Sequence, residues 1–497
     1  MVSLNSSLYV GLSGVRSAQV GINVTGNNIA NISTEGYSRQ RPDTTVKGVF
    51  TSEGLTFGTG SDVSRVFGLR DDLAEAAVTQ FQASNSYHEE LASSLAEAEA
   101  LMVDGEYTGI SKALGDFFSS LERATQRPND LATRQDLITA GNNISEEING
   151  RYNDLGDEQA RINIEIEDLV NKVNDLTLDI QSLNRQISSV AKPAEDLIDQ
   201  RRMAINELAK LVGVETIELP NNMVQVSIKG SNQILVGREI RNTLGVQTNA
   251  ANFGFNDVTI DVGGTVTVIT GTVETGEVGA KLQMRDVELN DLRRDLDRLA
   301  AGLIIQVNTI HDTGTDLNGN TNLRFFDPDN ATVLGATAVG TIDPDRYLGV
   351  AGTMSLSDDL RPAAGQPFDP TRIALSATGS VGDNGIALQL ANLRDNQDVI
   401  DQDLDGDPTN DSPLTYEKFY GGVMAQLGRK VELADTTYIT QNELLNQAEI
   451  RRDESAGVNL DEEAVQLTEY QRAFEASSRF LSVINQLTGE ILTRLGS

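Results

Sequence analysis

The feature that most restricts the fold of this chain is an unbroken apolar pattern between positions 162 and 190. The residues alternate steps of four and three: Ile162, Ile166, Leu169, Val173, Leu176, Ile180, Leu183, Ile187 and Val190. This heptad spacing predicts a long helix that packs against a second helix at a shallow angle. We favour a bundle core within one subunit over a seam between subunits. Pro193 interrupts the pattern, and we expect a helix again from Leu197 to Leu211.

Both ends of the chain also have helical periodicity, and the first segment carries almost no charge. Between Val2 and Thr34 the only charged side chain is Arg16. The first stripe consists of Leu4, Leu8, Val15, Ile22 and Ile29, with Gly11 and Ala18 in the same row. In the last segment, 460–495, one seam consists of Leu460, Ala464, Leu467, Phe474, Leu481 and Ile491. A lone helix with so sparse a seam is marginal in water, so we expect 1–43 and 457–497 to be disordered in the free chain and to order on assembly.

The middle of the chain alternates between helical and β-rich stretches. Segments 224–228 and 258–262 alternate apolar and polar residues, which is typical of strands. Segment 312–385 is rich in Gly, Pro, Asp and Thr and predicts loops and short strands. Further helices are expected at 71–101, 110–125, 281–311, 386–396 and 416–454.

We therefore predict an α+β fold, with a long-helix coiled-coil or bundle core built from both chain ends and β-rich inserted outer domains. The expected domains are a terminal helical assembly core (1–60 with 456–497), a long-helix bundle (61–212 with 281–311 and 386–455), a β-rich insert (213–280) and a loop-rich insert (312–385). Because the 213–280 insert lacks the seam pattern of the helices, we expect that its deletion leaves assembly largely intact.

Composition excludes several classes of function. The 497 residues include 39 basic and 73 acidic side chains, a net charge of −34. Nucleic acid and anionic membranes repel such a chain, so neither is an expected partner. Without cysteine there is no thiolate nucleophile or zinc–thiolate site, and we expect no cofactor. No apolar stretch reaches the length of a membrane span, and polar residues interrupt any candidate signal sequence near the start.

A segment near the start is similar to a known motif. Thr25-Gly-Asn-Asn-Ile-Ala-Asn-Ile-Ser-Thr-Glu-Gly-Tyr37, with its Asn28-Ile-Ala-Asn31 core, resembles the signature of the flagellar axial family of rod, hook and hook-associated subunits. Other segments resemble the hook-associated members of that family. They are Gly11-Leu-Ser-Gly14 with Gln19, Tyr37-Ser-Arg-Gln-Arg41, Asp316-Leu-Asn-Gly-Asn320 with Phe325-Phe326, Gly457-Val-Asn-Leu-Asp-Glu-Glu463, and Tyr470-Gln-Arg-Ala-Phe474 with Ala476.

The resemblance implies a structural subunit of the bacterial flagellum that joins hook to filament, and not an enzyme. It implies export through the flagellar type III pathway to an extracellular position, with the terminal helices in the axial tube and the middle domains facing outward. The implied partners are further copies of the chain, the hook subunit, a second junction protein with the filament, and a dedicated export chaperone at the C-terminal helix. We expect the assembly interface to include Leu4, Leu8, Val15, Ile22, Ile29, Asn31, Tyr37, Leu460, Leu467, Phe474, Leu481 and Ile491.

Two alternatives remain open at this point. One is a hook or distal-rod subunit of the same family. The other is a secreted calcium-dependent binding protein, because Asp401-Gln-Asp403-Leu-Asp405-Gly406 resembles the start of a calcium loop. The twelfth position of that loop is Ser412, where a bidentate Glu is needed, so we favour a solvated acidic loop. The 316–320 segment is a weaker calcium candidate, and His311 beside Asp312 is no catalytic triad by itself.

Overall fold

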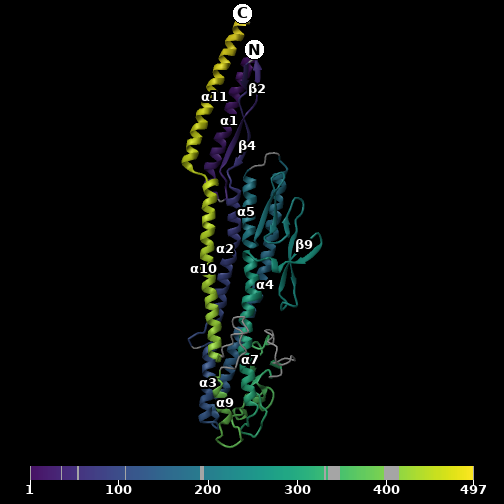
Figure 1. The fold of residues 1–497 in the computed structure, drawn as a ribbon, viewed down its shortest axis with the longest axis vertical. Coiled ribbons are helices and arrows are strands. Elements are labelled where there is room, and N and C mark those ends of the chain that lie inside the picture. Colours follow the sequence, from purple (N-terminus) through teal and green to yellow (C-terminus); the bar gives the residue numbers. More distant parts are fainter. Residues whose placement is uncertain are drawn as a thin grey trace.

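Long helices run side by side along an elongated molecule whose two termini lie at one end (Figure 1). The computed structural model describes residues 2–34, 36–52, 55–106, 108–190, 195–329, 332–333, 347–396 and 414–495. The helices are α1 (Val2–Ala30), α2 (Asp72–Met102), α3 (Ile110–Gln126), α4 (Leu131–Ser188), α5 (Glu195–Leu211), α6 (Gly276–Gln283), α7 (Leu289–His311), α9 (Gly385–Asn392), α10 (Tyr416–Ala456) and α11 (Leu460–Leu495). This arrangement confirms the predicted α+β class.

Among the described residues, ten strands form the larger β structure, all in antiparallel pairs or small sheets. They are β1 (Gln40–Val46), β2 (Val49–Ser52), β3 (Leu55–Gly58), β4 (Ser61–Gly68), β5 (Val214–Leu219), β6 (Met223–Ile228), β7 (Ile234–Val236), β8 (Thr243–Thr248), β9 (Asn256–Val262) and β10 (Thr265–Val268). The strand order is β1-β4, β2-β3, β5-β6-β7 and β10-β9-β8. Within 312–385, the strands β11 (Phe326–Asp327) and β12 (Ser355–Leu356) pair with each other.

The heptad run lies in the second half of α4 and is buried inside the chain. The Asp130 carboxylate caps the start of this helix by accepting a hydrogen bond from the Ala132 N–H. Most of the run is buried against neighbouring elements, whereas Leu176 and Leu183 are half-buried. The prediction for Val190 was wrong, because α4 ends at Ser188 and Val190 is exposed.

The β-rich insert is attached to α4 through side-chain amides as well as apolar contacts. Asn174 donates to the Leu244 carbonyl and accepts from the Leu244 N–H, so it continues the hydrogen bonding of β8. Asn184 makes the same pair of bonds with Val224 at the start of β6. Buried residues of both sheets and of α4 belong to one continuous apolar cluster. The insert is therefore part of the same core as the helices.

Two predicted helix boundaries need correction. The helix expected at 281–311 starts at Gly276, and a π-helical segment, Met284–Glu288, joins α6 to α7. The glycines at 276 and 279 look like turn residues in the sequence, yet both lie within α6. The helix expected at 386–396 ends at Asn392. α4 starts at Leu131, far before the predicted heptad run that begins at Ile162, whereas the other long helices agree with the predicted ranges to within about two residues.

Buried polar side chains attach the loop-rich 312–385 segment to α7. His311 ends α7; its Nε2 accepts from the Ala374 N–H, and its Nδ1 lies 2.5 Å from the Leu323 carbonyl oxygen. Nδ1 therefore carries the proton of a neutral ring. Burial lowers the pKa of His311 to about 4. Asp297, also in α7, accepts from the N–H groups of Gly349 and Ala351, and burial raises its pKa to about 6.

Candidate assembly surface

The helices α1 and α11 lie side by side at the end that carries the termini (Figure 1). Small residues on α1 allow this close approach. A Cβ added at Gly11 would lie 2.8 Å from the Leu481 side chain, and one at Gly21 would lie 2.5 Å from the Tyr470 ring. At Gly14 the nearest atom would be the Ser477 hydroxyl oxygen, at 2.6 Å. The glycines therefore set the contact distance between the two helices.

The structure divides the predicted interface residues between this internal contact and the surface. On α1, Leu8, Val15, Ile22 and Ile29 are half-buried, and the side chain of Leu4 lies outside the described part of the structure. On α11, Leu467 and Leu481 are half-buried. Leu460, Phe474 and Ile491 are exposed. The predicted C-terminal seam thus combines positions that face α1 with positions that face solvent.

The signature motif forms a hydrogen-bonded turn between α1 and β1. Asn28 is fully buried; its amide nitrogen donates to the Gln40 carbonyl, and its oxygen accepts from the Tyr37 hydroxyl and the Gln40 N–H. Asn27 donates to the Tyr37 hydroxyl oxygen. Asn31 donates to the Asn27 carbonyl one turn earlier. These asparagines and Tyr37 therefore fix the direction in which the chain leaves α1.

Glu463, near the start of α11, joins the two ends of the chain. Its carboxylate is fully buried and accepts hydrogen bonds from Asn28 at 2.9 Å, Arg39 at 2.7 Å and Arg41 at 3.1 Å. Burial raises the pKa of Glu463, but the hydrogen bonds from Asn28, Arg41 and Arg39 outweigh it and hold the pKa below its usual value. Glu462 forms an ion pair with Arg39 at 2.6 Å on the exposed side. This group is the strongest polar connection between α11 and the N-terminal segment.

The structure describes both chain ends as helical and paired, with buried polar contacts at Glu463 beside the sparse apolar seam. That these ends are disordered in the free chain and order on assembly stays a prediction. Both sequence segments, 38–41 and 461–463, stood out in the resemblance, but nothing in their spacing indicated that they meet. Their contact spans 424 residues between Arg39 and Glu463.

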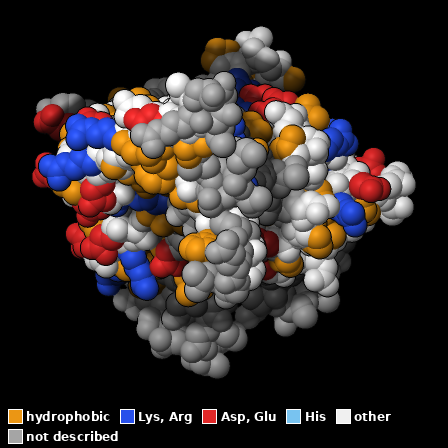
Figure 2. Space-filling view, turned by 90° about the horizontal axis from the view of Figure 1, so that it is seen from above, with side chains coloured by type: hydrophobic (Ala, Val, Ile, Leu, Met, Phe, Trp, Pro, Cys, Tyr) orange, Lys and Arg blue, Asp and Glu red, His pale blue; other side chains and the backbone are white. Residues whose placement is uncertain are grey.

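Beside the face that contacts α1, α11 carries an apolar stripe, which we define as Phe480, Val483, Leu487 and Ile491; the Phe480 ring also borders α1, because a Cβ added at Gly11 would lie 3.0 Å from it. These side chains are 42, 52, 43 and 42% exposed. Their spacing of three, four and four residues places them on one face of the helix, beside the face that contacts α1. Figure 2 shows hydrophobic side chains among charged ones at this end of the molecule. Exposed stripes of this kind on a helix are typical of sites that bind another helix.

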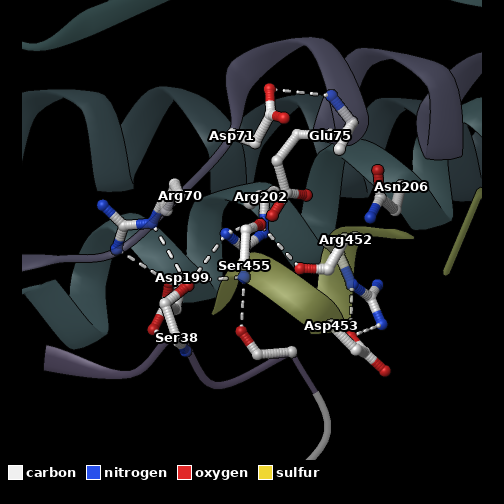
Figure 3. Close-up of polar contacts among 12 residues, drawn as sticks. Ser38, Arg70, Asp71, Glu75, Asp199, Arg202, Asn206, Arg452, Asp453 and Ser455 are labelled. Carbon is white, nitrogen blue, oxygen red and sulfur yellow. Dashed lines mark hydrogen bonds and ion pairs between the residues drawn. The ribbon is translucent and has the colours of Figure 1, made fainter. Parts of the chain in front are cut away.

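A cluster of charged and hydroxyl side chains, which we call the polar joint, connects this end of the molecule to the long helices (Figure 3). It consists of Ser38, Arg70, Glu75, Asp199 and Arg202. Ser38 precedes β1 and donates to Asp199 of α5 through both its N–H and its hydroxyl, each at 2.9 Å. The same hydroxyl oxygen accepts from Arg70 and Arg202.

The arginines of the joint are held by carboxylates from two helices. Arg70 contacts Glu195 at 2.7 Å and Asp199 at 2.8 Å. Burial lowers the pKa of Arg70, but the two carboxylates outweigh it and raise the pKa above its usual value. Arg202 lies 2.9 Å from Glu75 of α2, and burial raises the pKa of that carboxyl. No sequence pattern indicated this cluster, because its members are spread over more than 160 positions.

The calcium candidates divide between described and undescribed residues. The 401–406 segment lies outside the described residues. In the 316–320 segment, the Asp316 carboxylate already accepts from the N–H groups of Asn318 and Asn320 and from the Asn320 amide, so it forms a turn. Over the described ranges, no group of three or more His, Cys, Asp or Glu side chains is placed to hold a metal ion. No helix in those ranges combines the length and apolarity that a membrane span needs.

Comparison with known proteins gives consistent matches along the chain. A family model described as the flagellar hook-associated protein FlgK helical domain matches residues 95–326. Models of the flagellar basal body rod protein and of the flagellar basal body rod FlgEFG protein C-terminal region match residues 8–37 and 452–494. The chain is 24% identical to flagellar hook-associated protein 1 of Bacillus subtilis, over 99% of both chains. It is also 24% identical to flagellar hook-associated protein 1 of Escherichia coli, over 97% of this chain and 98% of the relative.

The fold is also similar to a solved structure. The flagellar hook junction protein FlgK from Burkholderia pseudomallei superposes with a TM-score of 0.64 at 15% sequence identity. The match covers 77% of this chain and 100% of the other. At that identity the likeness concerns the fold alone.

Proposed function

The chain belongs to the flagellar hook-associated protein 1 family, and from this premise we propose that it takes its place at the hook–filament junction through the apolar stripe of α11 and the half-buried residues of α1. It is a structural subunit of the bacterial flagellum. Its matches over nearly the whole length are to hook-associated protein 1, and nothing in them favours a hook or distal-rod subunit or a secreted calcium-binding protein.

The observation that carries the proposal is the apolar stripe of α11. In a chain with a net charge of −34, four large apolar side chains remain exposed on one helix face. Burying them against helices of neighbouring copies would contribute about 1.5–3 kcal/mol per fully buried side chain. The expected neighbours in the tube are further copies, the hook subunit on one side and the second junction protein with the filament on the other.

The same stripe supports the finer parts of the proposal. Before assembly it has to be kept from water or from premature pairing, which is a task for an export chaperone bound to α11. We place the assembled chain outside the cell, with α1 and α11 in the axial tube. The β-rich insert and the 312–385 segment face outward. We propose no catalytic role, no cofactor, and no nucleic acid or membrane partner.

The predicted domain boundaries stay a prediction, with one adjustment. Because β1 pairs with β4 from Gln40–Gly68 to Val46–Ser61, the terminal domain is better drawn as running to Gly68 than to residue 60. Residues 2–68 and 460–495 then form what we call the terminal unit, and the remaining described residues form the body.

The test is a double substitution in the stripe. Val483→Asp with Leu487→Asp would place two unpartnered carboxylates in a helix contact, which costs several kcal/mol. We expect cells that carry this variant to keep hooks and lose filaments, while the free chain melts as before because both positions are exposed. Ser482→Asp is the matched control, since it adds a carboxylate at an exposed polar position on the same helix. Normal filaments from the double variant would refute the proposal.

A further inference from the structure

The terminal unit and the body do not share an apolar core. The two clusters of buried apolar side chains contain residues from 77 to 448 only, so among the described residues neither cluster reaches into the terminal unit. Inside the terminal unit, by contrast, α1 and α11 make contact through closely spaced glycines. Domains that meet without a large apolar interface move relative to each other by default.

Polar groups make most of the connection between the two parts. Ser38 is fully buried, and its hydroxyl bonds to one carboxylate and two guanidinium groups of the polar joint. Beside it, the Gln40 amide donates to Asp196 at 2.8 Å. Glu195, Asp196, Asp199 and Arg202 all lie on α5, so one helix of the body supplies most of the partners.

The chain crosses between the two parts at two places, 68–71 and 457–459. Segment 37–40 of the terminal unit lies beside both, because backbone hydrogen bonds run from Arg39 to Ala456 and from Leu69 to Arg39. The second crossing is a link of three residues between α10 and α11. A Cβ added at Gly457 would lie 2.4 Å from the Asp453 carbonyl oxygen, so the glycine is required for the present direction of this link.

A cavity of about 620 Å³ lies beside these crossings. Its walls include Ser33 and Thr34 from the turn after α1, Arg202 from the joint, Arg452 from α10, and Glu462 from α11. Because the lining is largely polar, water can fill the space and replace hydrogen bonds as it changes shape. The terminal unit therefore has room to move without exposing apolar surface.

We propose that the polar joint is a hinge, with the Ser38–Asp199 contact as its pivot and the adjoining cavity as the space into which the terminal unit swings. The inference rests on the proposed function, in which one subunit has to fit between neighbours of different shape. The hinge allows the tube-forming helices and the body to take more than one relative angle while each keeps its internal contacts.

The absence of cysteine makes the hinge directly measurable in the full-length free chain. Spin labels on Arg479→Cys of α11 and Leu433→Cys of α10 report the angle between the two parts, and both positions are exposed. A second pair, Leu433→Cys with Ile164→Cys, lies wholly in the body and is the control. We expect the first pair to give a wider distribution of distances by double electron–electron resonance than the second.

Two variants test the pivot and the link separately. Ser38→Ala removes the hydroxyl and its three partners while the N–H bond to Asp199 remains, so it should widen the distribution further. Gly457→Ala forces the link to shift and should move the mean distance. In both variants, the distance distribution of the body pair should be unchanged, which would also show that the body is folded.

The opposite results would overturn the hinge. If the distance distribution of the first pair is as narrow as that of the body pair, and neither variant changes it, the connection between the terminal unit and the body is rigid. That result would leave the assembly role intact, since incorporation at the junction depends on the stripe of α11. Conversely, normal filaments from the stripe variant would leave the distance measurements valid.

Discussion

Asn28 illustrates how one side chain can determine a connection that the sequence motif only marks. Its side-chain amide donates and accepts hydrogen bonds at the same time: the nitrogen donates to Gln40 and Glu463, and the oxygen accepts from Tyr37 and Gln40. Aspartate could not donate, and leucine could neither donate nor accept, so the geometry requires an amide. The motif was recognisable from the sequence, but its partner on α11 was not.

Glu463 is the most informative single position for the pairing of the chain ends. Glu463→Gln would remove the charge that faces Arg39 and Arg41 in a buried site, at a cost of about 1.5–3 kcal/mol. We expect faster hydrogen exchange throughout α1 and α11, measured by mass spectrometry. Glu462→Gln is the matched control; its side chain is 58% exposed, and its loss should cost less than about 1 kcal/mol. Equal exchange in the two variants would contradict the role assigned to Glu463.

His311 should make stability depend on pH in a predictable direction. Its pKa is about 4 in the fold and about 6.5 when unfolded, so the stability it contributes is present above about pH 6.5 and lost as the pH falls toward 4. Asp297, with a pKa of about 6, acts in the opposite sense and adds stability as the pH falls. Comparing the wild type with His311→Asn isolates the contribution of His311 to the pH dependence of stability.

The stability advantage of the wild type over His311→Asn should shrink by on the order of 3 kcal/mol between pH 7 and pH 4. Urea unfolding followed by circular dichroism measures it. A constant difference across this range would mean that the ring is not held neutral by burial.

At the scale of the helix, the contact between α1 and α11 depends on which glycines face the partner. Gly21→Ala brings a methyl group to 2.5 Å from the Tyr470 ring and should cost about 1–3 kcal/mol. Gly26 also lies in α1 but has nothing within 4 Å of an added Cβ, so Gly26→Ala should stabilise the helix by about 0.5–1 kcal/mol. Hydrogen exchange of α11 distinguishes the two variants. Loss of protection in both would contradict the face of α1 that we assign to the contact with α11.

Most helices were predictable because their apolar periodicity is long, as in α4 and α10. The start of α6 was not, since Gly276 and Gly279 favour turns, and Gly276 itself has a φ of 77°, outside the helical region. The exposed half of the α11 seam could not be separated from the buried half for a similar reason. Periodicity identifies apolar faces, but not which neighbour covers each one.

At the scale of the whole molecule, the β-rich insert shares the core of the long helices, which its sequence pattern did not indicate; that its deletion leaves assembly largely intact stays a prediction. Buried residues of the insert, including Val226, Leu235 and Ile260, share one core with Val173 and Ile180 of α4. Replacing 214–274 by a short linker should therefore expose the α4 seam and cost several kcal/mol. Thermal unfolding measures it. Val266→Thr with Val268→Thr, both on the exposed strand β10, should stay within about 0.5 kcal/mol of the wild type. Unchanged melting of the deletion variant would contradict the stabilising role assigned to the shared core.

The overall class and the position of the assembly helices followed from composition, periodicity and motif. The polar joint and the shared core did not, because both depend on contacts between segments far apart in the chain, such as Ser38 with Asp199. Charged residues at helical spacing usually face solvent, so nothing marked Asp199 or Arg202 as buried partners.

The contact between Asn28 and Glu463 has a consequence for the order of folding. Closing a loop of 435 residues carries an entropy cost before any bond forms, and that cost grows with loop length. Folding of the body removes most of it, since α2 and α10, whose ends at Asp72 and Ala456 adjoin the terminal unit, pack side by side. The terminal unit should thus be the last part to form and the first to open. A chain that emerges gradually at its site of use would keep its tube-forming helices unpaired until its final residues arrive.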